Sequence, residues 1–212
     1  VADGATVAGD DLIDALWPDD PPRRAAAALQ SHISRVRSHL GVAADQLVAS
    51  GRGYRLRLRH GQLDVHAARD GLADARTVAD DDPAAAADRL ATVRALWRGR
   101  ALAEFGDLLQ IASRGIALDD LRREVDALLI QCALRAGDLD RAVAASATAV
   151  ADDPMDEPLL RLRMEVLSTA GRRADALQAA SDLRRRLRDE LGLEPTAALA
   201  DLERRIADGR LA

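Results

Sequence analysis

The chain has 212 residues, of which 48% are hydrophobic and 31% are charged, so it is not intrinsically disordered and is expected to fold as a soluble globular protein. Its formal net charge is −5, all 30 basic residues are arginine, and only 2% of residues are aromatic, which predicts a core of Ala, Leu, Val and Ile. The single cysteine, Cys132, excludes an internal disulfide, and no apolar run approaches the ~20 residues of a membrane helix, which predicts a cytoplasmic protein.

The arginines are unevenly distributed along the chain. Residues 1–60 contain eight Arg and seven Asp, a net charge of +1, whereas residues 61–212 contain 22 Arg and 28 acidic residues, a net charge of −6. From Arg23 to Arg59 the eight Arg accompany a single acid, Asp45, which gives a local net charge of +7. A basic block in an acidic chain is typical of a nucleic-acid surface, although a solvated basic face has the same composition.

Two helices are predicted in the first sixty residues. GDDLIDALWP (residues 9–18) has its apolar residues on one face, and Pro18 ends the helix by disfavouring helical backbone at Trp17. A second helix is expected from about Arg24 to Leu40, with Gly41 as its C-terminal cap. The apolar stripe of this second helix, which is expected to face a core, consists of Leu29, Ile33, Val36 and Leu40.

The opposite face of the second helix is small and polar. At ~100° per residue, the side chains that point away from the apolar stripe are Ser31, Ser34, Arg35 and Ser38. The flanks of this face carry His32 and Arg37. Short side chains allow a helix to enter a major groove closely, where an arginine can read guanine edges or hold phosphates.

The segment QLVASGRGYRLRL (residues 46–58) predicts a β-hairpin. Leu47–Val48 and Tyr54–Leu58 have strand character, and apolar residues alternate with arginines in the second strand. Gly51 and Gly53 permit positive φ in the turn, so Arg52 is expected to project from the tip. Neither Lys-Ser/Thr nor a helix follows, which excludes a phosphate-cradling loop of the nucleotide-binding kind.

Two helices followed by a hairpin with an arginine at its tip resemble a winged helix-turn-helix. The segment is similar to the OmpR/PhoB-type effector domain of the SARPs, the Streptomyces antibiotic regulatory proteins. The recognition-helix pattern of that family matches residues 33–37, ISRVR, and its wing pattern Gly-x-Gly-Tyr-Arg matches residues 51–55, GRGYR. The resemblance implies a DNA-binding domain over residues 1–60 that lacks the N-terminal sheet and the first helix of the family.

The resemblance also assigns roles to individual residues. Arg35 is implied to read bases, and Arg52 is implied to enter the adjacent minor groove. The residues implied to position phosphates are His32, Ser34 and Arg37. The expected DNA-binding set is completed by Ser31, Ser38 and Arg55.

HGQLD (residues 60–64) is interpreted as the crossing into a second domain, residues 61–212, in which helix follows helix. Gly137 and Gly171 are 34 residues apart, as are Ala142 and Ala176, and 34 residues is the period of the tetratricopeptide repeat. The sequence therefore predicts a mainly α chain. A partial winged helix with a β-hairpin wing is followed by an all-α, tetratricopeptide-like helical domain.

Two motifs of the second domain resemble the bacterial transcriptional activator domain, which follows the winged helix in SARP-type regulators. They are ALWRGRALAEF (residues 95–105) and RRRLRDELGLEPTAALADLERRI (residues 184–206). The resemblance implies a homodimer that binds double-stranded DNA at direct-repeat promoter sites. It also implies contact with RNA polymerase, activation of secondary-metabolism genes and a nucleoid-associated location.

The sequence predicts neither an enzyme nor a cofactor or metal site. The four histidines form no spaced set with Cys132, and no serine lies in a G-x-S-x-G context. ADDPMDEP (residues 151–158) lacks the central glycine and the final glutamate of an EF-hand loop, so its acids are interpreted as turns and helix caps.

Two functions remain open. The favoured one is a sequence-specific DNA-binding transcriptional regulator. The alternative is a helical protein-interaction adaptor whose truncated winged helix no longer binds DNA. A strand and helix encoded upstream of Val1 would favour the regulator, whereas translation that starts at Val1 would favour the adaptor.

Overall fold

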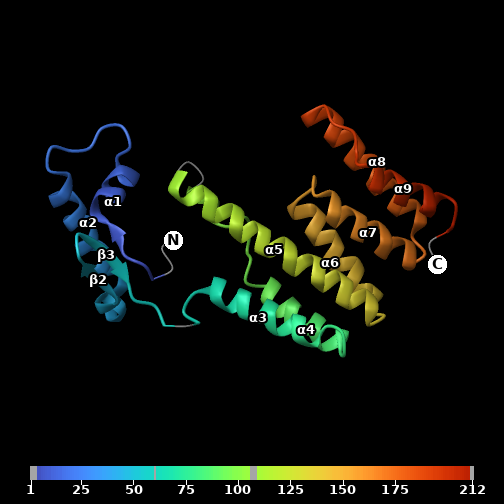
Figure 1. The fold of residues 1–212 in the computed structure, drawn as a ribbon, viewed down its shortest axis with the longest axis horizontal. Coiled ribbons are helices and arrows are strands. Elements are labelled where there is room, and N and C mark those ends of the chain that lie inside the picture. Colours follow the sequence, from blue (N-terminus) through green and yellow to red (C-terminus); the bar gives the residue numbers. More distant parts are fainter. Residues whose placement is uncertain (1–3, 60, 106–108, 211–212) are drawn as a thin grey trace. The chain divides into compact units, whose positions relative to one another are not determined.

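The computed structural model describes residues 4–59, 61–105 and 109–210 (Figure 1). Contacts divide the chain into two compact units, of which the first comprises residues 1–66 with 102–115 and the second comprises residues 67–101 with 116–212. The predicted domain boundary between residues 60 and 61 stays a prediction, and His60 lies outside the described residues. The predicted fold class, a partial winged helix followed by an all-α domain, is confirmed.

The first unit consists of two helices and a small sheet. Along the chain its elements are β1 (Val7–Ala8), α1 (Gly9–Leu16), α2 (Ala25–Leu40), a 3₁₀ turn (Gly41–Gln46), β2 (Leu47–Ser50) and β3 (Gly53–Leu56). The strands are antiparallel in the order β1-β3-β2, and Ser50 pairs with Gly53 next to the turn. The predicted hairpin is confirmed, and the short strand β1 adds to it an edge that was not predicted.

The apolar stripe of α2 is only partly buried. Leu29 is 4% exposed, but Val36 is 46% exposed, so the prediction that Val36 faces a core is wrong. α1 packs on the first half of α2, where Ile13 and Leu29 line one small cavity. Within residues 4–59 no element covers the side chain of Val36, which lies about two helical turns further along.

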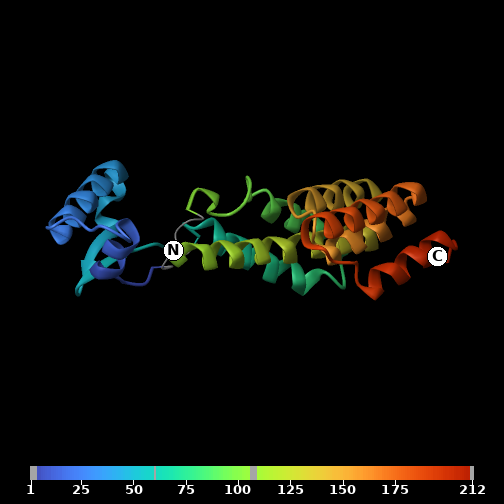
Figure 2. The same cartoon turned by 90° about the horizontal axis from the view of Figure 1, so that it is seen from above.

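The second unit is a succession of helices joined by short turns, which Figure 2 shows from above. Its helices are α3 (Asp64–Val78), α4 (Pro83–Arg94), α5 (Leu109–Arg135), α6 (Leu139–Asp152), α7 (Glu157–Thr169), α8 (Arg173–Arg186) and α9 (Ala197–Ala207). A 3₁₀ turn (Ala103–Phe105) precedes α5, and a π-helical turn (Leu187–Leu191) extends α8. By contacts, residues 64–66 of α3 and residues 109–115 of α5 are grouped with the first unit.

Aspartates cap three of the helices of this unit, as predicted for its acidic turns. Asp82, Asp138 and Asp156 each accept a hydrogen bond from the backbone N–H three residues ahead, at the starts of α4, α6 and α7. Such caps satisfy N–H groups that have no partner within the helix, and each contributes about 1 kcal/mol.

The 34-residue repeat is confirmed by equivalent hydrogen bonds. Gly137 donates to the carbonyl of Leu134, and Gly171, 34 residues later, donates to that of Ser168. Both glycines have positive φ, +76° and +74°, where a side chain would be strained. The two copies of the repeat are therefore the turn into α6 and the turn into α8.

Two aliphatic cores stabilise the helices. The first spans α3 to α7 and includes Leu90, Ile130 and Cys132, and burial raises the pKa of the Cys132 thiol. The second joins α7, α8 and α9 through residues such as Leu183 and Leu202. Their composition agrees with the predicted core of Ala, Leu, Val and Ile.

Arginine–aspartate pairs join the same helices. Arg94 on α4 donates from Nε to Asp126 on α5 at 2.6 Å and pairs through Nη2 with Asp152 on α6. Arg122 also pairs with Asp152, at 2.8 Å. Asp126 and Arg122 are each only 3% exposed, so these two residues lie inside the helical unit, whereas the side chain of Asp152 is 36% exposed.

Candidate nucleic-acid interface

One face of α2 carries the small polar residues predicted to meet DNA. Four of these residues are exposed, namely Ser31, Ser34, Arg35 and Ser38, while His32 and Arg37 on the flanks are half-buried. The exposure agrees with the helical arrangement expected from the sequence. Their contact with DNA stays a prediction.

Two of the three serine hydroxyls of this face already donate within the helix. Ser31 donates to the carbonyl of Ala27 and Ser38 to that of Ser34, both at 3.1 Å. Their lone pairs can still accept, but their protons are engaged. Arg35 is exposed and forms no side-chain hydrogen bond or ion pair among the described residues, so its guanidinium offers the unused donors of this face.

The two flanking residues, Arg37 and His32, connect α2 to other parts of the first unit. The Nε of Arg37 donates to the carbonyl of Leu47 at 2.9 Å, which ties α2 to β2. The His32 ring lies against Trp17, which follows the end of α1, with ring centroids 5.6 Å apart. Both residues therefore have a structural role besides the phosphate contacts predicted for them.

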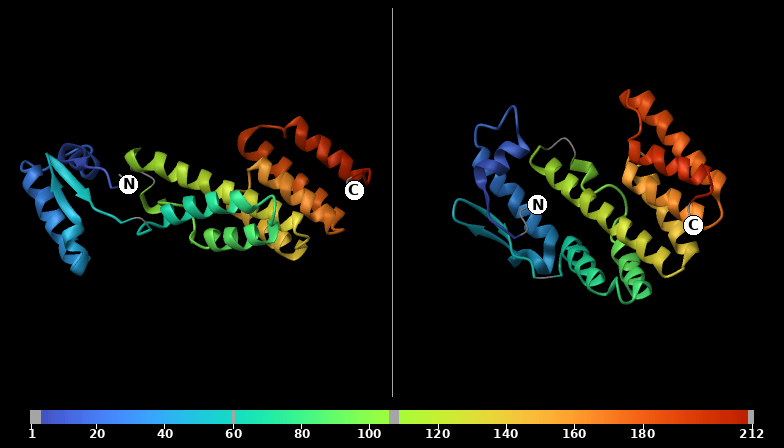
Figure 3. Two further views of the ribbon diagram at one scale, coloured as in Figure 1. Left: turned by 60° about the horizontal axis from the view of Figure 1, so that its bottom comes forward. Right: turned by 45° about the vertical axis from the view of Figure 1, so that its right-hand side comes forward.

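The β2–β3 hairpin lies beside α2 (Figure 3). Arg52 and Arg55 are exposed, and Arg52 follows Gly51, whose φ of +58° forms the turn. The carbonyl of Arg52 accepts a hydrogen bond from the N–H of Gly9 at 3.0 Å. The backbone of the predicted tip residue is thereby fixed to the start of α1, and its side chain remains exposed.

Gly53 does not have the positive φ that the sequence predicted for it. It is required for close approach instead, because an added Cβ would lie 1.9 Å from the carbonyl oxygen of Val7 in β1. The unpredicted strand β1 explains the glycine. A glycine in a strand can mark a close approach of backbone, but nothing in the sequence identifies β1 as the neighbour.

The arginines of this unit have no acidic partners. Among the described residues, none of the eight arginines from Arg23 to Arg59 forms an ion pair, although Asp10, Asp11 and Asp14 are in the same unit. At least thirteen of the 22 arginines after residue 61 do form one. The guanidinium groups around α2 and the hairpin therefore have no direct acidic partner among the described residues.

Within residues 4–59, 61–105 and 109–210, no three His, Cys, Asp or Glu side chains are grouped as metal ligands would be. No helix in those ranges combines the length and the apolar character needed to cross a bilayer.

Comparison with known proteins identifies the helical part. The family model of the bacterial transcriptional activator domain matches residues 63–207. The chain belongs to this family. The activator-domain family was predicted from residues 95–105 and 184–206, which both lie within the match.

Relatives extend the match over nearly the whole chain. The chain is 36% identical to the regulatory protein AfsR of Streptomyces griseus over 220 residues, which cover 99% of this chain and 22% of that protein. It is 32% identical to the regulatory protein DnrI of Streptomyces peucetius, covering 92% of this chain and 75% of that protein. The predicted resemblance to SARP-type regulators is confirmed.

A solved structure matches both parts of the fold. The Mycobacterium tuberculosis EmbR structure, a complex with a low-affinity phosphopeptide, superposes with a TM-score of 0.81 at 26% identity. The match covers 97% of this chain and 55% of that chain. The chain thus spans about a fifth of AfsR and about half of EmbR.

Proposed function

We propose that this chain is a sequence-specific DNA-binding transcriptional regulator of the SARP type, an activator of secondary-metabolism genes rather than an enzyme. The observation that carries the proposal is the group of exposed arginines without acidic partners on α2 and the hairpin. Lys and Arg that neutralise phosphates supply most of the affinity of such proteins for DNA. The names of the relatives AfsR and DnrI, both regulatory proteins, support the same function.

In the proposed complex, α2 enters the major groove and the hairpin lies at the adjacent minor groove. Arg35 reads base edges, and Arg52 contacts the minor groove. His32, Ser34 and Arg37 position phosphates, with the remaining contacts from Ser31, Ser38 and Arg55. Since hydroxyl protons of two serines are engaged in the helix, these serines accept rather than donate in the complex.

The proposal includes the partners that the family implies. A homodimer binds direct repeats in promoter DNA, and the helical domain supports dimerisation and contact with RNA polymerase. Such a protein acts in the cytoplasm on the nucleoid.

The test is a mobility-shift titration with a duplex selected by the wild-type chain from a randomised pool. Arg35→Ala is expected to weaken binding to the selected duplex by about five- to 150-fold, that is 1–3 kcal/mol, with little effect on a scrambled duplex. Arg52→Ala is expected to weaken binding to both duplexes alike and to lower the salt slope by about one.

Arg205→Ala serves as the matched control, because Arg205 is an exposed arginine of α9 outside this surface. It is expected to bind both duplexes as the wild type does. If Arg35→Ala and Arg52→Ala also bind like the wild type, the proposed interface is wrong.

A further inference from the structure

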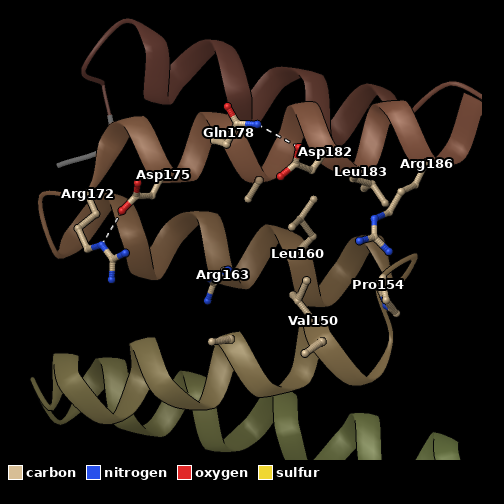
Figure 4. A pocket seen from close by; sticks show the side chains of 13 residues that line it. Val150, Pro154, Leu160, Arg163, Arg172, Asp175, Gln178, Asp182, Leu183 and Arg186 are labelled. Carbon is tan, nitrogen blue, oxygen red and sulfur yellow. Dashed lines mark hydrogen bonds and ion pairs between the residues drawn. The ribbon is translucent and has the colours of Figure 1, made fainter.

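A groove runs between α6, α7 and α8 in the helical unit (Figure 4). Its volume is about 680 Å³, which is within the range of pockets that bind ligands. Small or aliphatic side chains form its floor, and they are Ala147, Val150, Ala151, Leu160, Ala179 and Leu183. Because three of these are alanines, the helices leave open space where larger side chains would fill it.

Among the charged residues that line the groove, the aspartates have partners and two of the arginines do not. Asp175 accepts from Arg172 at 2.7 Å, and Asp182 accepts from Gln178 at 3.0 Å and from Arg185 at 2.8 Å. Both acids are therefore neutralised by neighbours. Arg163 and Arg186 also line the groove, and neither forms a hydrogen bond or an ion pair through its side chain among the described residues.

The environment of Arg163 is energetically unfavourable for its charged guanidinium group. It lies on α7 and is half-buried, and its Nη1 is enclosed without a hydrogen-bond partner. Burial and then the positive charge of Arg172 lower the pKa of Arg163, with Asp175 opposing them. A buried donor left unsatisfied destabilises a fold, so a protein that only needed this helix to pack would be better served by an uncharged residue.

We propose that this groove binds an acidic peptide segment of a partner protein, with carboxylates at Arg163 and Arg186 and aliphatic side chains on the alanine-rich floor. Guanidinium and carboxylate form paired, charge-assisted hydrogen bonds, and neither Arg163 nor Arg186 has an acidic partner among the described residues. The proposal does not rest on DNA binding, since every residue of the groove lies in the helical unit.

The apolar floor decides between a peptide and a nucleic acid. A phosphate backbone has no aliphatic groups to cover Val150, Leu160 and Leu183, whereas a peptide that alternates acidic and aliphatic residues covers both parts of the groove.

Fluorescence anisotropy with the full chain tests the proposal, using a labelled short peptide of alternating Asp and Leu. This peptide is expected to bind, and its isosteric Asn and Leu counterpart at least about tenfold more weakly. Arg163→Gln and Arg186→Gln are each expected to weaken binding of the acidic peptide about tenfold or more. Ala179→Trp, which fills the groove without changing its charge, is expected to abolish binding.

Arg205→Gln removes the same charge from α9 outside the groove and is expected to bind like the wild type. Equal weakening by Arg205→Gln, or equal binding of the two peptides, would overturn the proposal. If duplex DNA displaces the peptide and Arg163→Gln abolishes this displacement, the groove is a nucleic-acid surface instead. Arg186 is exposed, so Arg186→Gln keeps the test decisive if Arg163→Gln alters folding.

Two further readouts separate this proposal from DNA binding. Arg163→Gln is expected to raise the midpoint of thermal unfolding while it weakens peptide binding, because a disfavoured charge is removed. Arg35→Ala is expected to leave peptide binding unchanged, and Arg163→Gln to leave the DNA titration unchanged. If Arg35→Ala weakens peptide binding and Arg163→Gln does not, the peptide binds at the surface around α2, which would contradict the proposal.

Discussion

The two units of this molecule use arginine in opposite ways. In the first, the eight arginines between Arg23 and Arg59 have no ion-pair partner among the described residues, and Leu29 is the one buried large hydrophobic residue described there. In the second, arginines join helices through pairs such as Arg94 with Asp126, and two aliphatic cores lie between the helices.

We therefore expect anions to bind where several unpaired arginines lie together, rather than wherever arginines are numerous. An exposed arginine without a partner keeps its donors for a ligand, whereas a buried pair has its donors satisfied and contributes to the fold. The net charge of −5 hides this distinction, because the acids that outnumber the arginines are concentrated in the helical unit.

The largest expected effect comes from breaking a buried pair. Arg94→Ala leaves Asp126, which is 3% exposed, without its hydrogen-bond partner on α4. We expect the free energy of unfolding of the helical unit to fall by about 3–5 kcal/mol. Urea unfolding measures this through Trp97 fluorescence in a Trp17→Phe background, since these are the two tryptophans of the chain.

Arg76→Ala is the matched control in the same unit. Its pair with Glu124 is 2.8 Å long, but the two side chains are 57% and 55% exposed. Solvent screens such pairs, so the expected loss is about 0–1 kcal/mol. If Arg94→Ala destabilises the protein no more than Arg76→Ala, the buried arginine pairs do not stabilise the helical unit more than exposed pairs do.

The second effect concerns the first unit, where backbone contacts take the place of a large core. Gly53→Ala places a Cβ 1.9 Å from the carbonyl oxygen of Val7, so β1 must move away from β3. We expect a loss of about 1–3 kcal/mol, as for other overpacked sites, and the loss is confined to this unit. Trp17 fluorescence in a Trp97→Phe background reports it.

Gly51→Asn tests whether the turn or the close approach matters. Gly51 has a φ of +58° and nothing lies within 4 Å of an added Cβ, and Asn tolerates this backbone conformation. The expected change is therefore small. Equal destabilisation by Gly51→Asn and Gly53→Ala would mean that the hairpin is sensitive to any glycine replacement and that β1 has no special role.

Local patterns in the sequence were enough for much of the fold and the candidate site. The period of α2 predicted that Ser31, Ser34, Arg35 and Ser38 share an exposed face, and the glycines of the hairpin predicted an exposed Arg52. The 34-residue spacing predicted the helical repeat, since each turn depends on its own few residues. Whether these residues bind DNA stays a prediction, because burial and hydrogen bonds do not identify a ligand.

Features that depend on distant contacts could not be predicted in this way. β1 has two residues and no periodicity, so neither the strand nor the reason for Gly53 was visible. Leu191 lies four residues after the buried Leu187, a spacing that keeps side chains on one face of an α-helix, but it is 55% exposed because the π-helical turn changes the helical register. The groove around Arg163 likewise depends on which helices become neighbours.

The smallest expected effect concerns the pH dependence of the helical unit. Burial raises the pKa of Asp126 above its ordinary value of 3.8, although Arg94 opposes this change. A carboxyl whose folded-state pKa is raised contributes stability below its unfolded pKa and loses that contribution as the pH rises through the folded-state value. Relative to Asp126→Asn, the wild type should therefore lose stability as the pH rises above about 4.

Urea unfolding of both proteins from pH 4 to pH 7, followed through Trp97, measures this difference, and we expect it to be smaller than the effect of Gly53→Ala. Asn keeps an acceptor for Arg94, so the comparison isolates the charge of residue 126 from its hydrogen bond. If the wild type gains stability relative to Asp126→Asn as the pH rises, attraction to Arg94 outweighs burial. The arginine pairs of this unit would then stabilise it as charges and not only as hydrogen bonds, which would sharpen its contrast with the unpaired arginines around α2.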